Sequence, residues 1–429
     1  MNGGPRHDPA VSILQRAVDG TAAGDTLVVH GGVYVGSLRI RRPMSLVGLR
    51  RPVLDGGGRG DVVTIDAPGV TLEGFWIRGS GLDLGANDAA VKVRGAAARV
   101  RGNLVTRSLH GIYLEGASGA LVEGNEVRGA ESLERADRGN GIHLWNSRAN
   151  VVRRNRVRAS RDGLYFAASP ANRIGGNLVE DTRIGLHYMY SDTNAFTGNV
   201  FRRNEAGAAI MLSRALDVRG NRFVENVGHR AYGLLLQTAD DSRVEQNVVA
   251  GNTVGLFLDN ANRNVVRDNV VAGNFLGVHL YASAERNEFG GNAFAANEHD
   301  LLNDGGRDAN DWAPRGRGNW WDENPAWDLE GDGIADAPHR IADPWASLAR
   351  RAPSAVLFTR SPALDALAAA ERFFPAFRGD APVDAAPLAQ PPLRAGGAPG
   401  RRVAPVLAAA SALAVLGAAA SALVRRRAA

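Results

Sequence analysis

The sequence predicts an all-β protein, a right-handed parallel β-helix whose coils are about 22 residues long. One observation is a glycine that recurs through the middle of the chain, with five of its seven steps 22 residues long. Another is an asparagine that recurs at nearly the same interval. A fixed period of this length indicates repeated units whose equivalent side chains stack on one another. The glycines are Gly111, Gly141, Gly163, Gly185, Gly207, Gly233, Gly255 and Gly277, and the asparagines are Asn103, Asn125, Asn155, Asn177, Asn199, Asn221, Asn247, Asn269 and Asn292.

Each coil alternates apolar and polar residues after its recurring glycine. The first and third residues are apolar, as Leu164 and Phe166 are, and a period of two is typical of a strand with one buried face. A polar turn precedes most of the recurring asparagines and holds a second, partial column of this residue type. Asparagine tolerates left-handed backbone and its amide can bond from coil to coil, so we interpret both columns as structural. The second column contains Asn150, Asn172, Asn194 and Asn264.

Segments of different composition flank the coils. A short helix over residues 11–18 is expected to cap the first coil, and a tryptophan-rich segment is expected to close the last. The uncharged stretch 403–424 is long enough to cross a bilayer, with a packed or mobile alanine-rich tail as the alternative. The predicted organisation is an N-terminal capping segment (1–23), the β-helix (24–302), a Trp- and Asp-rich cap (303–345), a docking helix region (346–378), a linker rich in Pro, Ala and Gly (379–402) and a transmembrane helix (403–424).

Charge and cysteine content exclude several classes of function. The chain has no cysteine, which excludes disulfides and thiolate metal sites. Its net charge of +5 comes from arginines spread along the coils rather than gathered in one run, so we predict a solvated surface and no nucleic-acid partner. The N-terminal residues lack a charged segment followed by an apolar one, so the chain as given does not predict a signal peptide.

The second and fourth residues after each recurring glycine should face solvent if the first and third are buried. An ordinary solvated face would consist of Ser, Thr, Lys and Glu, whereas this one is rich in aromatic residues, His and Met. We therefore predict a binding face on this side of the coils. Its aromatic and His members are Tyr113, Trp145, Tyr165, Phe257, His279 and Tyr281.

A Met and His cluster on this face predicts a Cu(I) site. Met189 and Met211 are 22 residues apart, so they should lie in neighbouring coils about 5 Å from each other. His187 is two residues from Met189 on the same face, and His143 belongs to a preceding coil. Thioether and imidazole ligands without thiolate suit Cu(I). The alternative is a soft patch that docks another protein.

A second candidate metal site lies in the Trp- and Asp-rich cap. Its carboxylates alternate around a glycine turn, as they do in calcium-binding loops. The loop lacks the glutamate that ends a full EF-hand, so a hydrogen-bonded turn is the alternative. The candidate calcium ligands are Asp328, Glu330, Asp332 and Asp336.

The sequence favours a non-catalytic protein over an enzyme acting on polysaccharides. Glycosidic-bond chemistry needs paired carboxylates at a defined separation. The exposed columns offer Glu115 and Asp259, which are many coils apart, while Asp240 and Asp241 lie in a turn. A polysaccharide lyase, hydrolase or epimerase of similar fold remains the alternative function.

Several motifs taken in order resemble the NosD family, whose members take part in nitrous-oxide reductase maturation. The closest matching phrase is Gly185-Leu-His-Tyr-Met-Tyr-Ser191, and the resemblance extends from about Gly24 to Phe377. Single coils of this kind are common among parallel β-helices, whereas the ordered set is specific. The other matching segments are 139–147, 163–166, 231–236, 318–322, the Asp-rich loop that ends at Asp336, and Ser361-Pro362 with the helix after it.

The resemblance implies an extracytoplasmic, periplasmic β-helix that is not an enzyme. Members of this family work with an ABC transporter, made of a membrane permease and a cytoplasmic ATPase, and a copper chaperone lipoprotein supplies Cu(I). The complex serves assembly of the copper sites of nitrous-oxide reductase. The predicted C-terminal membrane helix is not part of the family pattern, and it would anchor this chain to the membrane.

Overall fold

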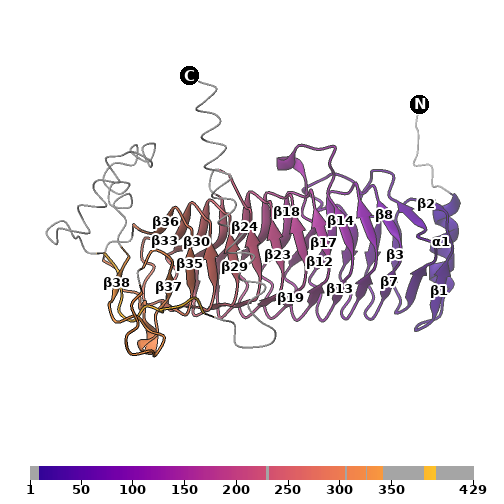
Figure 1. Cartoon of the computed structure of the whole chain (residues 1–429). Coiled ribbons are helices and arrows are strands. Elements are labelled where there is room, and N and C mark those ends of the chain that lie inside the picture. Colours follow the sequence, from indigo (N-terminus) through magenta and orange to yellow (C-terminus); the bar gives the residue numbers. More distant parts are fainter. Residues whose placement is uncertain (1–8, 229–230, 305–306, 325, 342–380, 393–429) are drawn as a thin grey trace, which may run out of the picture. The chain divides into compact units, whose positions relative to one another are not determined.

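The computed structural model describes residues 9–228, 231–304, 307–324, 326–341 and 381–392 (Figure 1). The chain divides into two compact units, Met1–Asp217 and Val218–Ala429. In each unit, short strands stack in parallel as successive coils, which confirms the predicted all-β parallel solenoid. The described helices are α1 (Pro9–Gly20) and the short 3-10 helices η1 (Arg135–Asp137) and η2 (Pro314–Gly316).

In the first unit, every coil adds one strand to each of three parallel sheets, called here sheets A, B and C. Sheet A contains β1 (Thr26–Val29), β4 (Ser45–Gly48), β7 (Thr71–Glu73), β10 (Arg99–Arg101), β13 (Leu121–Glu123), β16 (Val151–Arg153), β19 (Arg173–Gly175) and β22 (Ala195–Thr197). Sheet B contains β2 (Val33–Val35), β5 (Val53–Asp55), β8 (Trp76–Arg78), β11 (Leu104–Thr106), β14 (Glu126–Arg128), β17 (Arg156–Arg158), β20 (Leu178–Glu180) and β23 (Val200–Arg202). Sheet C contains β3 (Leu38–Ile40), β6 (Val63–Ile65), β9 (Ala89–Val93), β12 (His110–Glu115), β15 (Ile142–Trp145), β18 (Asp162–Ala167), β21 (Ile184–Met189) and β24 (Ala206–Arg214).

The second unit repeats the same three-sided coil, and β25 (Asp217–Arg219) lies at the boundary in sequence. Its A strands are β28 (Arg243–Glu245), β31 (Val265–Arg267) and β34 (Glu288–Gly290). Its B strands are β26 (Arg222–Val224), β29 (Val248–Ala250), β32 (Val270–Ala272), β35 (Ala293–Ala295) and β37 (Trp320–Trp321). Its C strands are β27 (Tyr232–Asp240), β30 (Val254–Asp259), β33 (Leu276–Tyr281) and β36 (His299–Asn303).

The recurring asparagines form a buried hydrogen-bonded ladder inside the turns between sheets A and B. The Oδ1 atom of Asn177 accepts hydrogen bonds from the main-chain N–H and the side-chain amide of Asn155, both at 3.0 Å. The Nδ2 atom of Asn177 donates to the Val152 carbonyl at 2.9 Å and to Asn199 Oδ1 at 2.9 Å. Each amide therefore satisfies main-chain groups that the turn would otherwise bury unpaired.

The second asparagine column forms a similar ladder, and the structure shows a third that the sequence analysis missed. In the second unit, the main-chain N–H of Asn226 donates to Asn252 Oδ1 at 3.0 Å, and that of Asn252 donates to Asn274 Oδ1 at 2.9 Å. Each of these residues follows a first-ladder asparagine by five positions, so the signal was present in the sequence. The third ladder occupies the turn that leads from sheet B to sheet C.

The recurring glycines are required by close contacts inside the coil. A Cβ atom on Gly163 would lie 2.1 Å from Val179 Cγ1 and 2.7 Å from the carbonyl oxygen of Gly185. No side chain fits at these distances, so the period of the glycine follows from the packing of one coil on the next.

Up to β36, the longest turns of the regular coil lie between sheets B and C, within the described residues. They lie between β5 and β6, between β8 and β9, between β14 and β15, where η1 is found, and between β26 and β27. The other connections on this side are short; for example, β17 ends at Arg158 and β18 begins at Asp162. The one 30-residue step of the glycine period therefore reflects an insertion at this turn.

Separate elements cover the first strands of the first unit and the last strands of the second. Helix α1 lies against β2 and β3 with Leu14 and Val18 buried, and Gln15 exchanges two hydrogen bonds of 2.9 Å with the main chain of Arg39. In the second unit, the Trp312 ring stacks on Phe289 at 4.3 Å and the Trp321 ring on Phe294 at 4.2 Å. Both tryptophans are buried, so they extend the apolar core at this end.

Part of the segment assigned to the linker packs against this cap. Strand β38 (His339–Arg340) pairs antiparallel with β39 (Val383–Asp384), and Asp384 is fully buried. The predicted docking helix region (346–378) and the predicted transmembrane helix (403–424) lie outside the described residues. Among the helices that the structure describes, none has both the length and the apolar character needed to cross a bilayer.

Candidate functional site

The candidate site is a column of stacked side chains on sheet C of the first unit. It is carried by β12, β15, β18 and β21, where the second residue after each glycine lies in register with its equivalent in the next coil. Ring centroids are 4.4 Å apart for Tyr113 and His143, 4.5 Å for His143 and Tyr165, and 5.0 Å for Tyr165 and His187. The column of rings ends at His187, because its partner in β24 is Ala209.

The prediction that this whole column faces solvent is wrong. Tyr113 is only 3% exposed and His143 only 8% exposed, while Tyr165 and His187 are partly buried. The cause is that stacked rings cover one another and that His110, at 5.2 Å from the His143 ring, covers them from the side. The fourth-position column is more accessible, since Trp145 is 47% exposed.

The aromatic residues predicted from the later coils belong to the second unit. The rings of Phe257 and His279 are stacked at 4.5 Å, and His279 Nε2 lies 2.9 Å from an oxygen of Asp304. Tyr281 is 47% exposed. The second unit therefore has its own aromatic and His surface on the equivalent strands.

Beside the column lies a row of polar residues that the sequence analysis missed. His110, Asn140 and Asp162 each directly precede a recurring glycine, which is the signal that could have identified them. His110 Nδ1 accepts a hydrogen bond from the main-chain N–H of Asn140 at 3.0 Å, and the Asn140 amide lies 3.3 Å from His143 Nδ1. Burial, with nearby Arg161 and Lys92, lowers the pKa of His110 to about 4, and burial also holds the pKa of His143 well below its usual range. Both imidazoles are therefore neutral at neutral pH.

Asp162 is the centre of an ion-pair network in this row. Its side chain has no exposed surface, and Arg183 donates to both carboxylate oxygens, from Nε at 2.9 Å and from Nη2 at 2.7 Å. His187 Nδ1 lies 2.9 Å from the same carboxylate. Burial would raise the pKa of Asp162, but the bonds from His187 and Arg183 outweigh it and lower that pKa. The group is therefore a carboxylate at neutral pH.

Three of the four predicted copper ligands come together at the end of the column. Met189 and Met211 are direct partners in the register of β21 and β24, as the 22-residue period predicts, and both are partly exposed. His187 is two residues before Met189 on the same face of β21. His143 is two coils away from His187, with the Tyr165 ring between them. The geometry therefore groups His187 with the two methionines and separates His143 from them.

The carboxylates of the candidate calcium loop are engaged in main-chain hydrogen bonds. Asp328 accepts from the N–H groups of Gly331 and Gly333 at 2.6 and 2.9 Å, and Asp336 accepts from that of Leu329 at 2.9 Å. Asp332 accepts from the main-chain N–H of Ile334 at 2.8 Å, and Glu330 is exposed. Within the part of the chain that the structure describes, no three His, Cys, Asp or Glu residues are arranged to hold a metal ion. These contacts favour the hydrogen-bonded turn.

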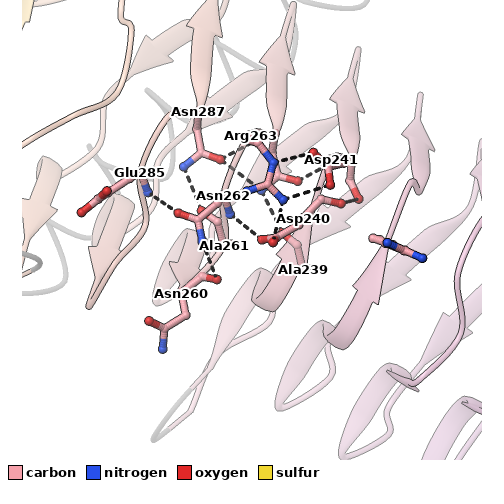
Figure 2. Close-up of polar contacts among 12 residues, drawn as sticks. Ala239, Asp240, Asp241, Asn260, Ala261, Asn262, Arg263, Glu285 and Asn287 are labelled. Carbon is pink, nitrogen blue, oxygen red and sulfur yellow. Dashed lines mark hydrogen bonds and ion pairs between the residues drawn. The ribbon is translucent and has the colours of Figure 1, made fainter.

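The two neighbouring carboxylates Asp240 and Asp241, which the sequence places in a turn, are both bound by Arg263. The guanidinium bonds Asp240 at 2.9 Å and Asp241 at 2.7 and 3.0 Å, as Figure 2 shows. The other oxygen of Asp240 accepts from the main-chain N–H of Asn262 at 2.8 Å. Both carboxylates thus link their turn to the turn of the next coil by hydrogen bonds and ion pairs, and neither is available as a general acid or base.

Comparison with known proteins gives matches to one family over most of the chain. The model of the family described as "Periplasmic copper-binding protein (NosD)" matches residues 126–326. A protein of Pseudomonas aeruginosa named "Probable ABC transporter binding protein NosD" is 39% identical over 84% of this chain and 87% of its own length. The protein of that name from Stutzerimonas stutzeri is 35% identical over 84% of this chain and 86% of its own length.

Solved structures match this chain at lower sequence identity. The A-module of the mannuronan C-5 epimerase AlgE6 from Azotobacter vinelandii is 12% identical, with a TM-score of 0.45 over 70% of this chain and 92% of that one. A family 28 exopolygalacturonase from Yersinia enterocolitica is 13% identical, with a TM-score of 0.46 over 70% of this chain and 74% of that one. The sequence relatives are far closer than these enzymes. The sequence identity of the two NosD relatives to this chain, sustained over most of the length of each protein, shows that this chain belongs to the NosD family.

Proposed function

We propose that this chain is a periplasmic accessory protein that handles Cu(I) during maturation of the copper sites of nitrous-oxide reductase. The observation that carries the proposal is the pairing of Met189 with Met211 beside His187, at the accessible end of the ring column. Support also comes from the family description as a periplasmic copper-binding protein.

The chemistry of the three side chains suits Cu(I) as a transient cargo. Two thioethers and one imidazole form a soft ligand set without thiolate, which favours Cu(I) over harder divalent ions. Met189, Met211 and His187 are all partly exposed, so a donor protein can reach them. The fully stacked His143 then supports the column rather than binding the metal.

The proposed partners follow from the family. Two relatives are named as ABC transporter binding proteins, and we propose that this chain also works with a transporter made of a permease and an ATPase. A copper chaperone lipoprotein would supply Cu(I), and nitrous-oxide reductase would be the final recipient. No catalytic role is proposed, because Asp240 and Asp241, the pair considered for polysaccharide chemistry, are both bound by Arg263.

A Cu(I) titration against a competing chelator tests the proposal. The Met189→Leu/Met211→Leu double variant should bind Cu(I) at least tenfold more weakly than the wild type, because leucine keeps the volume but lacks the thioether. Met44→Leu is the matched control, since Met44 is buried in the core of the same unit. Equal affinities for the wild type and the double variant would contradict the metal site and leave the methionines as a docking patch.

A further inference from the structure

We infer that Asp162, held by Arg183, fixes the tautomer of His187 so that Nε2 is the unprotonated nitrogen offered to Cu(I). Asp162 is then a positioning residue that does not touch the metal. The inference rests on the proposed function, since it concerns the same cluster of His187, Met189 and Met211.

The backbone places Asp162 where it can act on His187. Asp162 begins β18 and lies in register with Ile184, which begins β21. From the preceding coil its carboxylate reaches two side chains of the next coil, Arg183 and His187. The carboxylate has no exposed surface, so water does not compete for these bonds.

The contacts of Asp162 determine which ring nitrogen carries the proton. Arg183 donates to both carboxylate oxygens, and an ionised carboxylate can only accept hydrogen bonds. The Nδ1 atom of His187, 2.9 Å away, must therefore be the donor. A neutral imidazole with its proton on Nδ1 has its free lone pair on Nε2, as in carboxylate–histidine–metal arrangements.

The same contact leaves Nε2 on the part of the ring that does not face Asp162. Asp162 lies beside Ile184, which precedes His187 along β21, whereas Met189 follows His187 on the same face. The two nitrogens flank Cε1 and their in-plane bonding directions diverge widely, so with Nδ1 bound to Asp162 the Nε2 atom is directed away from that carboxylate and stays free for a ligand. The next coil contributes only the methyl group of Ala209 at this position, so no further ring stacks on His187 from that direction.

The competing explanation is a purely structural network in which His187 is an imidazolium between Asp162 and its surroundings. The two explanations differ in the protonation of Nε2 before any metal is added. Nitrogen NMR of protein labelled at histidine, recorded at pH 7.5 without copper, reads this directly, and His187→Gln assigns the signal among the nine histidines. We expect a protonated Nδ1 and an unprotonated Nε2 in the wild type.

The Asp162→Asn variant then tests whether the carboxylate is the cause. The His187 signals should change to a mixture of tautomers or to the Nε2–H form, and Cu(I) affinity should fall roughly 10- to 100-fold, as for other removed partners of metal-bound histidines. Glu180→Gln is the matched control, because Glu180 is also a buried carboxylate held by arginines but lies on sheet B. It should leave both readouts unchanged.

The outcomes separate this inference from the proposed function. An imidazolium or an Nε2–H tautomer in the wild type overturns the inference, whatever the copper affinity, and so does an Asp162→Asn variant with unaltered His187 signals. If the wild type has the expected tautomer but binds no Cu(I), the proposed function fails while the control of the tautomer by Asp162 stands. If Asp162→Asn does not fold, the tautomer of His187 in the wild-type spectrum still tests the inference. An Arg183→Gln variant provides the second test, since it should also lower the affinity for Cu(I).

Discussion

The carboxylate of Asp384 lies above Asn319 in the position that the next asparagine of the ladder would occupy. Its Oδ2 atom accepts from the main-chain N–H of Asn319 at 2.7 Å and from its side-chain amide at 3.3 Å. Asn319 Oδ1 receives the same two bonds from Asn292, at 3.1 and 2.8 Å. A residue more than sixty positions away in sequence thus ends the ladder and satisfies its last donors.

Replacing Asp384 with alanine should loosen the C-terminal cap. The change removes the acceptor for Asn319 and for the Trp321 indole N–H, which Asp384 Oδ2 binds at 3.0 Å, and we expect a loss of about 2–4 kcal/mol in stability. Hydrogen exchange at β37 and β39 should rise before exchange in the remaining coils. The control is Asp332→Ala, in an exposed turn, which should cost under about 0.5 kcal/mol. If both variants lose the same stability, the hydrogen bonds that Asp384 accepts from Asn319 and Trp321 do not stabilise the cap.

Replacing Asn177 with alanine should destabilise the first unit by about 2–4 kcal/mol, because it leaves the main-chain N–H of Asn155 and the carbonyl of Val152 buried without partners. Urea unfolding followed by circular dichroism measures the loss. Asn177→Asp offers a sharper comparison, since it keeps the acceptor oxygen but cannot donate to Val152. It should also be destabilising, and a neutral effect of the aspartate would show that only the acceptor matters.

Glu180 should make stability depend on pH in the acid range. Burial raises the pKa of Glu180, but bonds from Arg156, Arg202 and Arg203 outweigh it and lower that pKa to about 2, from an ordinary value of 4.5. A carboxyl whose pKa is lowered by folding stabilises the protein above its unfolded pKa, and this stabilisation is lost as the pH falls from about 4.5 toward 2.

We therefore expect Glu180→Gln to be less stable than the wild type by about 1–3 kcal/mol at pH 7, a value reduced because the three arginines are partly exposed. The difference should shrink below pH 4.5 and nearly vanish near pH 2. Denaturant midpoints of both proteins across this range provide the measurement. A constant difference at every pH would show that shape rather than charge explains the effect.

Gly163→Ala should disturb the packing between coils, because its Cβ would overlap Val179 Cγ1 at 2.1 Å. A loss of about 1–3 kcal/mol in thermal or urea unfolding is expected for such overpacking. Gly124→Asn is the comparison, since Gly124 has a φ of 63° with no atom near the new Cβ, and asparagine tolerates this conformation. If the two substitutions cost the same, backbone conformation and not the contact with Val179 is the cause.

The sequence predicts which residues occupy equivalent positions in successive coils, but it does not predict which side chains are covered by their neighbours. The spacing of Met189 and Met211 placed them side by side correctly, because the period of the coil determines the register. The alternation of apolar and polar residues does not predict the burial of Tyr113 and His143. Their neighbours His110 and Asn140 directly precede a recurring glycine, and the alternating pattern begins only after that glycine. The role of Asp384 was equally hidden, because a contact made once, across a long separation in sequence, leaves no periodic signal.

The longest turns before β36 enter sheet C, on the side where His110, Asn140 and Asp162 precede their glycines. Extra length at this corner leaves the asparagine ladder intact, since Asn125 still donates from its main-chain N–H and its side-chain amide to Asn155 Oδ1 across the longest of these turns. The length of the chain can therefore change at this corner without breaking the hydrogen bonds that hold successive coils together.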